Sequence, residues 1–351
     1  MSDKTVFVIG AGASKEVNLP VGKELKLRIS ELLNIKFVRS QINKGDEIIA
    51  SAFKKHVLDI KGNQADYNQY LIEAKKISKA LPLAISIDNY IDAHRENENI
   101  SFCGKLAIVK AILEAEGNSY LTLKGTINKE INFEILENTW YLPFFKLLTE
   151  NCNKNDLTER FKKIVLIIFN YDRCVEQFLY YALQRYYDIS EHESAELLKT
   201  LKIFHPYGIV GQLPFNSSDV TFDFGANPSP TKLLQLANEI KTFTEGTDPN
   251  SSDIIEIRKN MAIANKVVFL GFAFHKLNIE LIRPNLEFNN EEHYTECYGS
   301  AYGIPLQDHD VINNILSRYF EISNNNISLD IPNSTCKDFF SNYMRSLSFA
   351  D

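Results

Sequence analysis

The sequence predicts an α/β protein built on a Rossmann-like open parallel sheet that carries a large helical insertion. Two runs, Thr5–Ile9 and Ile164–Phe169, are apolar or β-branched at every position, as is typical of strands buried on both faces. The first run ends at a glycine and the second at an asparagine, and helical patterns follow both. Strands and helices that alternate in this way form parallel sheets covered by helices.

The first half of the chain contains the predicted insertion. Lys23–Leu33 has leucines and an isoleucine at helical spacing, and similar spacing recurs from about Ile35 to Arg160 without another clear strand. We therefore predict a discontinuous Rossmann domain, residues 1–33 and 160–351, interrupted by a helical domain at residues 34–159.

The second half of the chain contains the remaining strands. A helix is expected to start near Arg173, directly after the second strand. Three further strands are predicted at Lys202–Phe204, Val267–Leu270 and Ser300–Ile304. Helices are expected around Leu233–Phe243, Asp253–Ala264, Asp310–Tyr319 and Lys337–Leu347.

The composition excludes several classes of protein. The formal net charge is −7, so direct binding of nucleic acid is not expected. The longest apolar run, Ile164–Phe169, is far shorter than a membrane span of about 18 residues, and the first residues lack the pattern of a secretion signal. The five cysteines are scattered and form no C-x-x-C pair. This pattern favours buried thiols in a cytoplasmic protein over disulfides or a metal site.

The loop after the first strand is a candidate phosphate-binding turn, because ligands of open parallel sheets bind beyond the carboxyl ends of the strands. In Gly10-Ala11-Gly12 the missing Cβ atoms would let backbone amides approach a pyrophosphate. Lys15 replaces the third glycine of the G-x-G-x-x-G fingerprint, and no acidic residue ends a second strand about 20 residues later. An ordinary nicotinamide dehydrogenase is therefore not expected, and a tight turn without a ligand is the alternative for this loop.

Polar side chains follow the other strands. Asn170 has an amide that can donate and accept hydrogen bonds, and so can orient a ribose hydroxyl or a water molecule. Asp172 is expected to cap the following helix. His205 ends the third strand, and an unperturbed pKa of about 6.5 suits it to general-base catalysis, with a structural histidine as the alternative. His275 follows Gly271 closely and is expected to line the same cleft.

Taken in chain order, these segments resemble the sirtuin superfamily. Gly10–Ser14 with Leu19-Pro20 is similar to its G-A-G-x-S loop and the apolar-Pro step that follows. Phe169–Asp172 is similar to its Q-N-I-D motif, and His205 with the glycine three residues later resembles its His-Gly. Val268–Gly271 resembles the later strand whose glycine faces the adenosine half of NAD.

The similarity is closer to the sirtuin-like effectors of bacterial antiphage defence. Those proteins often have L-P-x-G after the first loop, here Leu19–Gly22, a Ser-Ile-Asp element, here Ser86–Asp88, and a late G-F-x-x-H-x-x-N segment, here Gly271–Asn278. The cysteine pairs that bind zinc in deacylating sirtuins are absent after His205, and Val21-Gly22-Lys23 replaces their Asp-Phe-Arg. The resemblance therefore implies NAD binding and cleavage rather than protein deacylation.

The implied activity is hydrolysis of NAD+ to nicotinamide and ADP-ribose, without a metal. The catalytic residues that the resemblance implies are Asn170, His205 and Asp172. The implied cofactor-binding residues are Gly10, Ala11, Gly12, Ser14, Leu19, Pro20, Gly271, Phe272 and His275. Because uncontrolled NAD cleavage would poison the cell, we expect a homo-oligomer or a partner to gate it, in this family a hexameric translocase ATPase. A non-catalytic NAD or ADP-ribose sensor and an ADP-ribosyl transferase are the alternatives, and the sequence does not separate hydrolysis from transfer or cyclisation.

Overall fold

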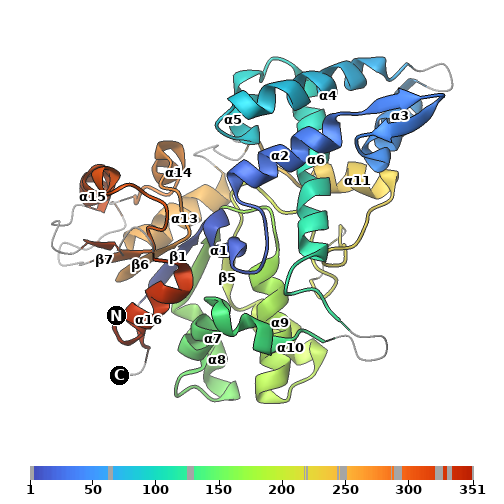
Figure 1. Ribbon diagram of the computed structural model, residues 1–351. Coiled ribbons are helices and arrows are strands. Elements are labelled where there is room, and N and C mark those ends of the chain that lie inside the picture. The colour runs from blue at the N-terminus through green and yellow to red at the C-terminus, as the bar shows by residue number, and fades with distance from the viewer. Residues whose placement is uncertain are drawn as a thin grey trace.

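A six-stranded parallel sheet lies at the centre of the computed structural model (Figure 1). Its strands are β1 (Thr5–Ile9), β4 (Ile164–Ile168), β5 (Lys202–Phe204), β6 (Lys266–Leu270), β7 (Glu296–Gly299) and β8 (Ile327–Leu329). Their order is β5-β4-β1-β6-β7-β8, and each neighbouring pair is parallel. The structure describes residues 4–61, 66–124, 130–216, 218, 220–242, 245, 251–285, 287, 295–320, 327–329 and 334–349. The predicted α/β class with a Rossmann-like open sheet is confirmed.

β1 separates two hydrophobic cores. Val6 pairs with Val165 of β4 on one side and with Val267 of β6 on the other. Because side chains alternate along a strand, Val6 and Val8 enter the core on one face of the sheet, whereas Phe7 enters the core on the opposite face. A strand that is buried on both faces needs the β-branched and aromatic sequence that β1 has.

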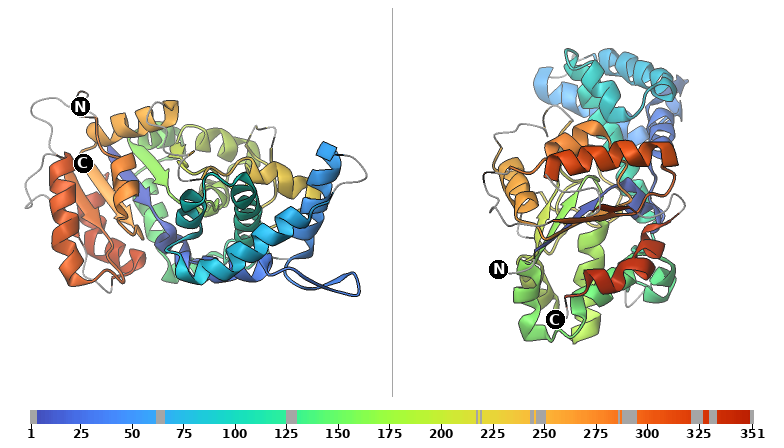
Figure 2. Two further views of the ribbon diagram at one scale, coloured as in Figure 1. Left: turned by 90° about the horizontal axis from the view of Figure 1, so that it is seen from above. Right: turned by 90° about the vertical axis from the view of Figure 1, so that its left-hand side faces the viewer.

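Helices cover both faces of the sheet (Figures 1 and 2). One layer contains α7 (Tyr141–Thr149), α8 (Leu157–Lys162), α9 (Cys174–Tyr187), α10 (Glu191–Leu198) and α16 (Cys336–Leu347). The opposite layer contains α13 (Ser252–Ala262), α14 (Lys276–Leu281) and α15 (Leu306–Phe320). Figure 2 (right) shows the sheet nearly edge-on between the two layers. Each helix within the described residues is too short or too polar for a bilayer crossing.

A third group of helices lies beyond the end of β1 (Figure 1). It contains α2 (Gly22–Leu33), α3 (Glu47–Lys61), α4 (Asn68–Ala80), α5 (Ile87–Ala93), α6 (Glu98–Gly117) and α11 (Pro230–Ala237). The short α1 (Ala11–Lys15) leads from β1 toward this group, and short 3-10 helices occur at Leu81–Leu83, Phe133–Asn138 and Lys154–Asp156. The apolar side chains of the group join the same core as Val6 and Val8, so these helices share a core with the sheet.

The helices that pack together do not coincide with the helical domain predicted at residues 34–159. α2 and α11 lie outside residues 34–159 but pack within the helical group. α7 and α8 lie inside that range but pack on the sheet, where Phe144 of α7 meets Phe7 of β1 edge-to-face with ring centroids 5.2 Å apart. Periodicity shows that a segment is a helix with an apolar face, but it does not show which surface that face covers.

Three local expectations are wrong. β2 (Lys36–Val38) and β3 (Gln41–Lys44) form an antiparallel hairpin within the segment expected to be helical, and their mostly exposed residues lack the apolar alternation that indicates a strand. The strand expected at Ser300–Ile304 lies earlier, at β7, because the chain turns after Gly299. α11 begins at Pro230, after the N-cap Ser229, and ends at Ala237, while Phe243 lies outside the described residues.

All five cysteines are unpaired and buried, as expected. Burial raises the pKa of each thiol above its ordinary value. The cysteines therefore serve as small apolar side chains in the cores.

A buried ion pair between Glu116 and Arg173 joins the end of α6 to the turn after β4. Arg173 donates from Nη2 to Glu116 Oε2 at 2.5 Å and from Nε to Oε1 at 3.0 Å, and their side chains are 1% and 0% exposed. Arg173 also donates to three backbone carbonyls in the loop 211–223, and the Gly225 N–H donates to Glu116 Oε2 at 3.0 Å. The pair therefore holds α6, the turn and the loop after β5 in one arrangement.

We predict that Arg173→Met lowers the free energy of unfolding by about 3–5 kcal/mol, because it leaves the Glu116 carboxylate buried without its partner. Urea unfolding followed by circular dichroism measures this change. Lys55→Met is the control, since Lys55 pairs with Asp59 on the surface and the loss is expected to be about 0.3–0.5 kcal/mol. Equal losses in the two variants would contradict the central role of the buried pair.

Candidate functional site

The order of the strands reverses between β1 and β6. Numbered along the chain, the six strands lie across the sheet as 3-2-1-4-5-6, which is the order of the doubly wound Rossmann fold. In such sheets ligands bind beyond the carboxyl ends of the strands, at the reversal. The residues that follow β1, β4, β5 and β6 therefore form the candidate site.

Three glycines bring the turns after β1 and β6 into direct backbone contact. The Gly10 N–H donates to the Leu270 carbonyl at 2.9 Å, and the Gly12 N–H donates to the Gly271 carbonyl at 3.0 Å. Gly271 has a φ of +54°, and a Cβ on it would lie 2.0 Å from the nitrogen of Ala13. Backbone packing thus requires glycine here, and the amide of Gly12 is already hydrogen-bonded.

Ser14 connects the turn after β1 to the polar residues after β4. Asn170 Nδ2 donates to Ser14 Oγ at 2.9 Å, and the Ser14 hydroxyl is also hydrogen-bonded to the side chain of Asp172. Asp172 Oδ1 accepts from the Cys174 N–H at 3.1 Å and so caps α9 as expected, although Arg173 is the N-cap residue by backbone conformation. Burial raises the pKa of the Asp172 carboxyl, and these hydrogen bonds oppose the rise.

His205 lies just beyond β5 and faces Glu176 in the first turn of α9. Its Nε2 is 2.7 Å from Glu176 Oε1, and its Nδ1 is 3.3 Å from the backbone oxygen of Asn170. Burial lowers the pKa of His205, but the nearby Glu176 carboxylate outweighs this effect, so the pKa of His205 is raised. Glu176 is not among the residues predicted from the sequence. Its place in the first turn of the helix that follows Asp172 was the available signal.

Alternate residues of the turn after β4 face opposite sides of the sheet. Asn170 and Asp172 face Ser14, whereas Tyr171 enters the opposite core. The Tyr171 hydroxyl donates to Asp88 in α5, so the Ser-Ile-Asp element of the helical group contacts the site. Burial raises the pKa of both Asp88 and Tyr171 above the ordinary values.

The segment Gly271–Asn278 contributes to this region through its two ends. Its first residue makes the backbone contact described above, and Asn278 Oδ1 accepts from the Tyr207 hydroxyl at 2.6 Å. Phe272 is buried in an aromatic cluster, and His275 is exposed at the start of α14. We expected both residues to bind the cofactor. In this structure Phe272 lies in the core and His275 lies on the surface.

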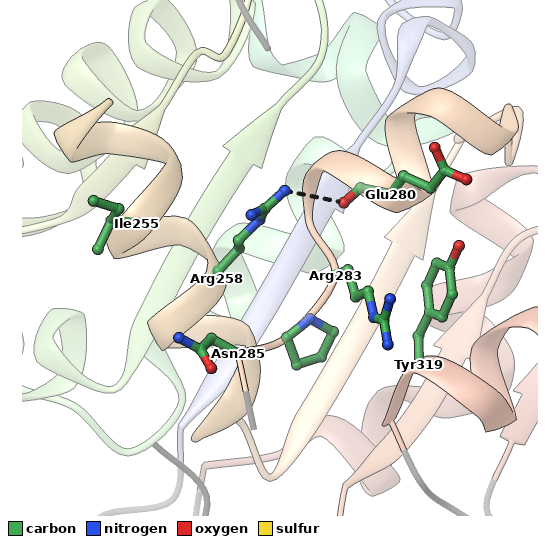
Figure 3. Close-up of a pocket in the computed structure, with 7 residues that line it drawn as sticks. Ile255, Arg258, Glu280, Arg283, Asn285 and Tyr319 are labelled. Atoms are coloured by element: carbon green, nitrogen blue, oxygen red, sulfur yellow. Dashed lines mark hydrogen bonds between the residues drawn. The ribbon is translucent and has the colours of Figure 1, made fainter. Parts of the chain in front are cut away.

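Ser14, Asn170, Asp172, Glu176 and His205 form a polar cluster, and two surface cavities have other residues as their lining. Leu19 and Pro20 line one of about 760 Å³, together with residues of α1, α2 and α6. The other, of about 520 Å³, lies between α13, the end of α14 and α15 (Figure 3). Its arginines have structural partners, because Arg258 Nε donates to the Leu281 carbonyl at 3.0 Å and the Arg283 guanidinium lies over a tyrosine ring. Neither cavity is lined by the polar residues after β4 and β5.

The polar cluster is closed to solvent in this structure. Ser14 and Asp172 are each 4% exposed, and Asn170 is 7% exposed. Within the described parts of the chain, no three His, Cys, Asp or Glu side chains converge as metal ligands would. A substrate can reach Asn170 only if the segments around it separate.

No protein-family model and no curated protein matches the sequence. The strand order and the polar cluster at the carboxyl ends of β1, β4 and β5 are therefore the observations on which a function rests.

We predict that Gly271→Ala lowers the free energy of unfolding by about 1–3 kcal/mol, because alanine at this φ is strained and its Cβ overlaps the backbone of Ala13. Gly22→Ala is the matched control. A Cβ at Gly22, the first residue of α2, meets nothing within 4 Å, so this change is expected to stabilise by about 0.5 kcal/mol. Urea unfolding measures both variants, and similar stabilities would refute the close contact between the two turns.

Proposed function

We propose that this protein is an NAD+ hydrolase that cleaves the bond between nicotinamide and ribose. The observation that carries the proposal is the meeting of Ser14, Asn170, Asp172 and His205 beside the reversal of strand order, where Rossmann folds bind dinucleotides. The motifs after β1, β4, β5 and β6 resemble those of sirtuin-like effectors, and this resemblance supports NAD as the dinucleotide.

The proposed reaction has one bond to break and one to form. The bond from C1′ of the ribose to the nicotinamide nitrogen breaks, its electron pair leaves with neutral nicotinamide, and the ribose gains oxocarbenium-like character. A water oxygen then bonds to C1′ and loses a proton. Asn170 orients the ribose or the water through its amide, and His205 takes the proton. Asp172 keeps Ser14 and Asn170 in place through the Ser14 hydroxyl.

The proposed activity requires the site to open. The polar cluster is buried, the Gly12 amide is bonded to Gly271, and Tyr171 is bonded to Asp88 in the helical group. A dinucleotide would have to replace the hydrogen bond between the Gly12 amide and the Gly271 carbonyl to reach the backbone of the Gly10–Ser14 loop. We therefore propose that a homo-oligomer or a partner protein opens the site, as a translocase ATPase does in the defence systems that this chain resembles. NAD depletion in an infected cell would be its role.

Product analysis tests the proposed activity. The purified protein is incubated with NAD+ at low and high protein concentration, and nicotinamide, ADP-ribose and cyclic ADP-ribose are separated by chromatography. We expect nicotinamide and ADP-ribose in equal amounts, with a higher specific activity at high concentration. Asn170→Ala should lower the rate by about 10²-fold or more, because the reacting groups lose their alignment. Asn68→Ala, at the exposed first residue of α4, should leave the rate unchanged.

Other products would point to the alternatives. Cyclic ADP-ribose would indicate cyclisation, and ADP-ribose attached to protein would indicate a transferase. Binding of NAD without turnover, alone and with the candidate partner ATPase, would indicate a sensor. Cleavage by Asn170→Ala at the wild-type rate would refute the assignment of the site.

A further inference from the structure

We propose that Glu176 is the positioning residue for His205: its carboxylate holds Nε2–H and thereby makes Nδ1 the nitrogen that accepts a proton. This inference rests on the proposed hydrolysis for its catalytic meaning, but the pairing of Glu176 with His205 can be tested without NAD. Neither the sequence motifs nor the family resemblance pointed to Glu176.

The geometry defines the roles of the two ring nitrogens. Glu176 Oε1 lies 2.7 Å from Nε2 of His205, a short contact typical of a charge-assisted hydrogen bond. Nδ1 lies 3.3 Å from the Asn170 backbone oxygen, which can only accept, so Nδ1–H donates this longer and weaker hydrogen bond when the ring is protonated. The shorter bond to the Glu176 carboxylate keeps a proton on Nε2, so Nδ1 is the nitrogen that loses its proton when the ring becomes neutral. That nitrogen is the one beside Asn170.

Both side chains of the pair are held in place. Glu176 lies in the first turn of α9 and His205 directly follows β5, and each side chain is only 11% exposed. Glu176 Oε2 is buried and has no hydrogen-bond partner among the described residues. A buried carboxylate that is only half satisfied is costly for stability alone, and this cost points to a role in function.

The groups around His205 and Glu176 favour the protonated form of His205. Asp172, in the turn before α9, faces His205, while Cys174 on α9 and Tyr141 on α7 face Glu176. These neighbours are a carboxyl, a thiol and a phenol, and the adjacent Arg173 is paired with Glu116 of α6. The charge of Glu176 therefore stabilises an imidazolium at His205 once Nδ1 has taken the proton from the attacking water.

Titration of His205 by NMR tests the pairing in the full-length protein. The chain is labelled with ¹⁵N-histidine, and His205→Gln assigns the signal. In the wild type we expect His205 to hold its proton to a higher pH than a free histidine. Glu176→Gln should reduce its proton affinity by about tenfold or more. Glu73→Gln is the matched control, because Glu73 is another buried glutamate with one unpartnered oxygen, in α4, and it should leave His205 unchanged.

The pH dependence of NAD cleavage tests whether the pairing of Glu176 with His205 contributes to catalysis. A base acts above its pKa, so kcat/KM should rise with pH as His205 loses its proton. In Glu176→Gln this rise should move to lower pH, and the plateau should fall by about 10²-fold. Glu176→Asp retains the charge and should restore the wild-type position of the rise with part of the rate. Glu73→Gln should change neither.

The outcomes separate the two proposals. An unchanged His205 titration in Glu176→Gln would overturn the role of Glu176, whether or not NAD is cleaved. A wild-type protein that cleaves no NAD while Glu176→Gln lowers the proton affinity of His205 would overturn the proposed hydrolysis and leave the pairing established.

Discussion

The buried ion pair between Glu116 and Arg173 is the interaction on which the arrangement of the site depends. Two charges removed from water are stable only when their hydrogen bonds are satisfied. Here the guanidinium bonds to the carboxylate and to three carbonyls of the loop 211–223, and the Gly225 N–H also bonds to the carboxylate. These partners come from α6, the turn after β4 and the loop after β5. A shift of any of them would break hydrogen bonds to a buried charge, so the turn that carries Asn170 is held in this arrangement while the site is closed.

The sheet then assigns the residues of that turn to two sides. Asn170 and Asp172 meet Ser14, while Tyr171 between them meets Asp88. One short turn thus contacts both α1 and the helical group. Tyr171 also belongs to the apolar core that the helical group shares with the sheet.

Burial gives the polar cluster its electrostatic character. Asp172 follows β4 and Asp88 lies in α5 beside Tyr171, and the pKa of each carboxyl is raised because burial disfavours its charged form. Glu176 is balanced by His205 and Glu116 by Arg173. In the proposed mechanism the cluster reacts only after it opens and substrate and water enter. The proposed need for an activating partner follows from this closure.

The sequence by itself determined the α/β class, β1, β4, β5 and β6, the capping role of Asp172 and the buried state of the cysteines, because these depend on the local order of apolar and polar residues. Only the tertiary structure decided which faces α2, α7 and α11 cover, that Gly12 meets Gly271, and that Glu176 pairs with His205. Those contacts join residues far apart in the chain or on different elements. They depend on the register and order of strands, which the pattern along a single chain does not encode.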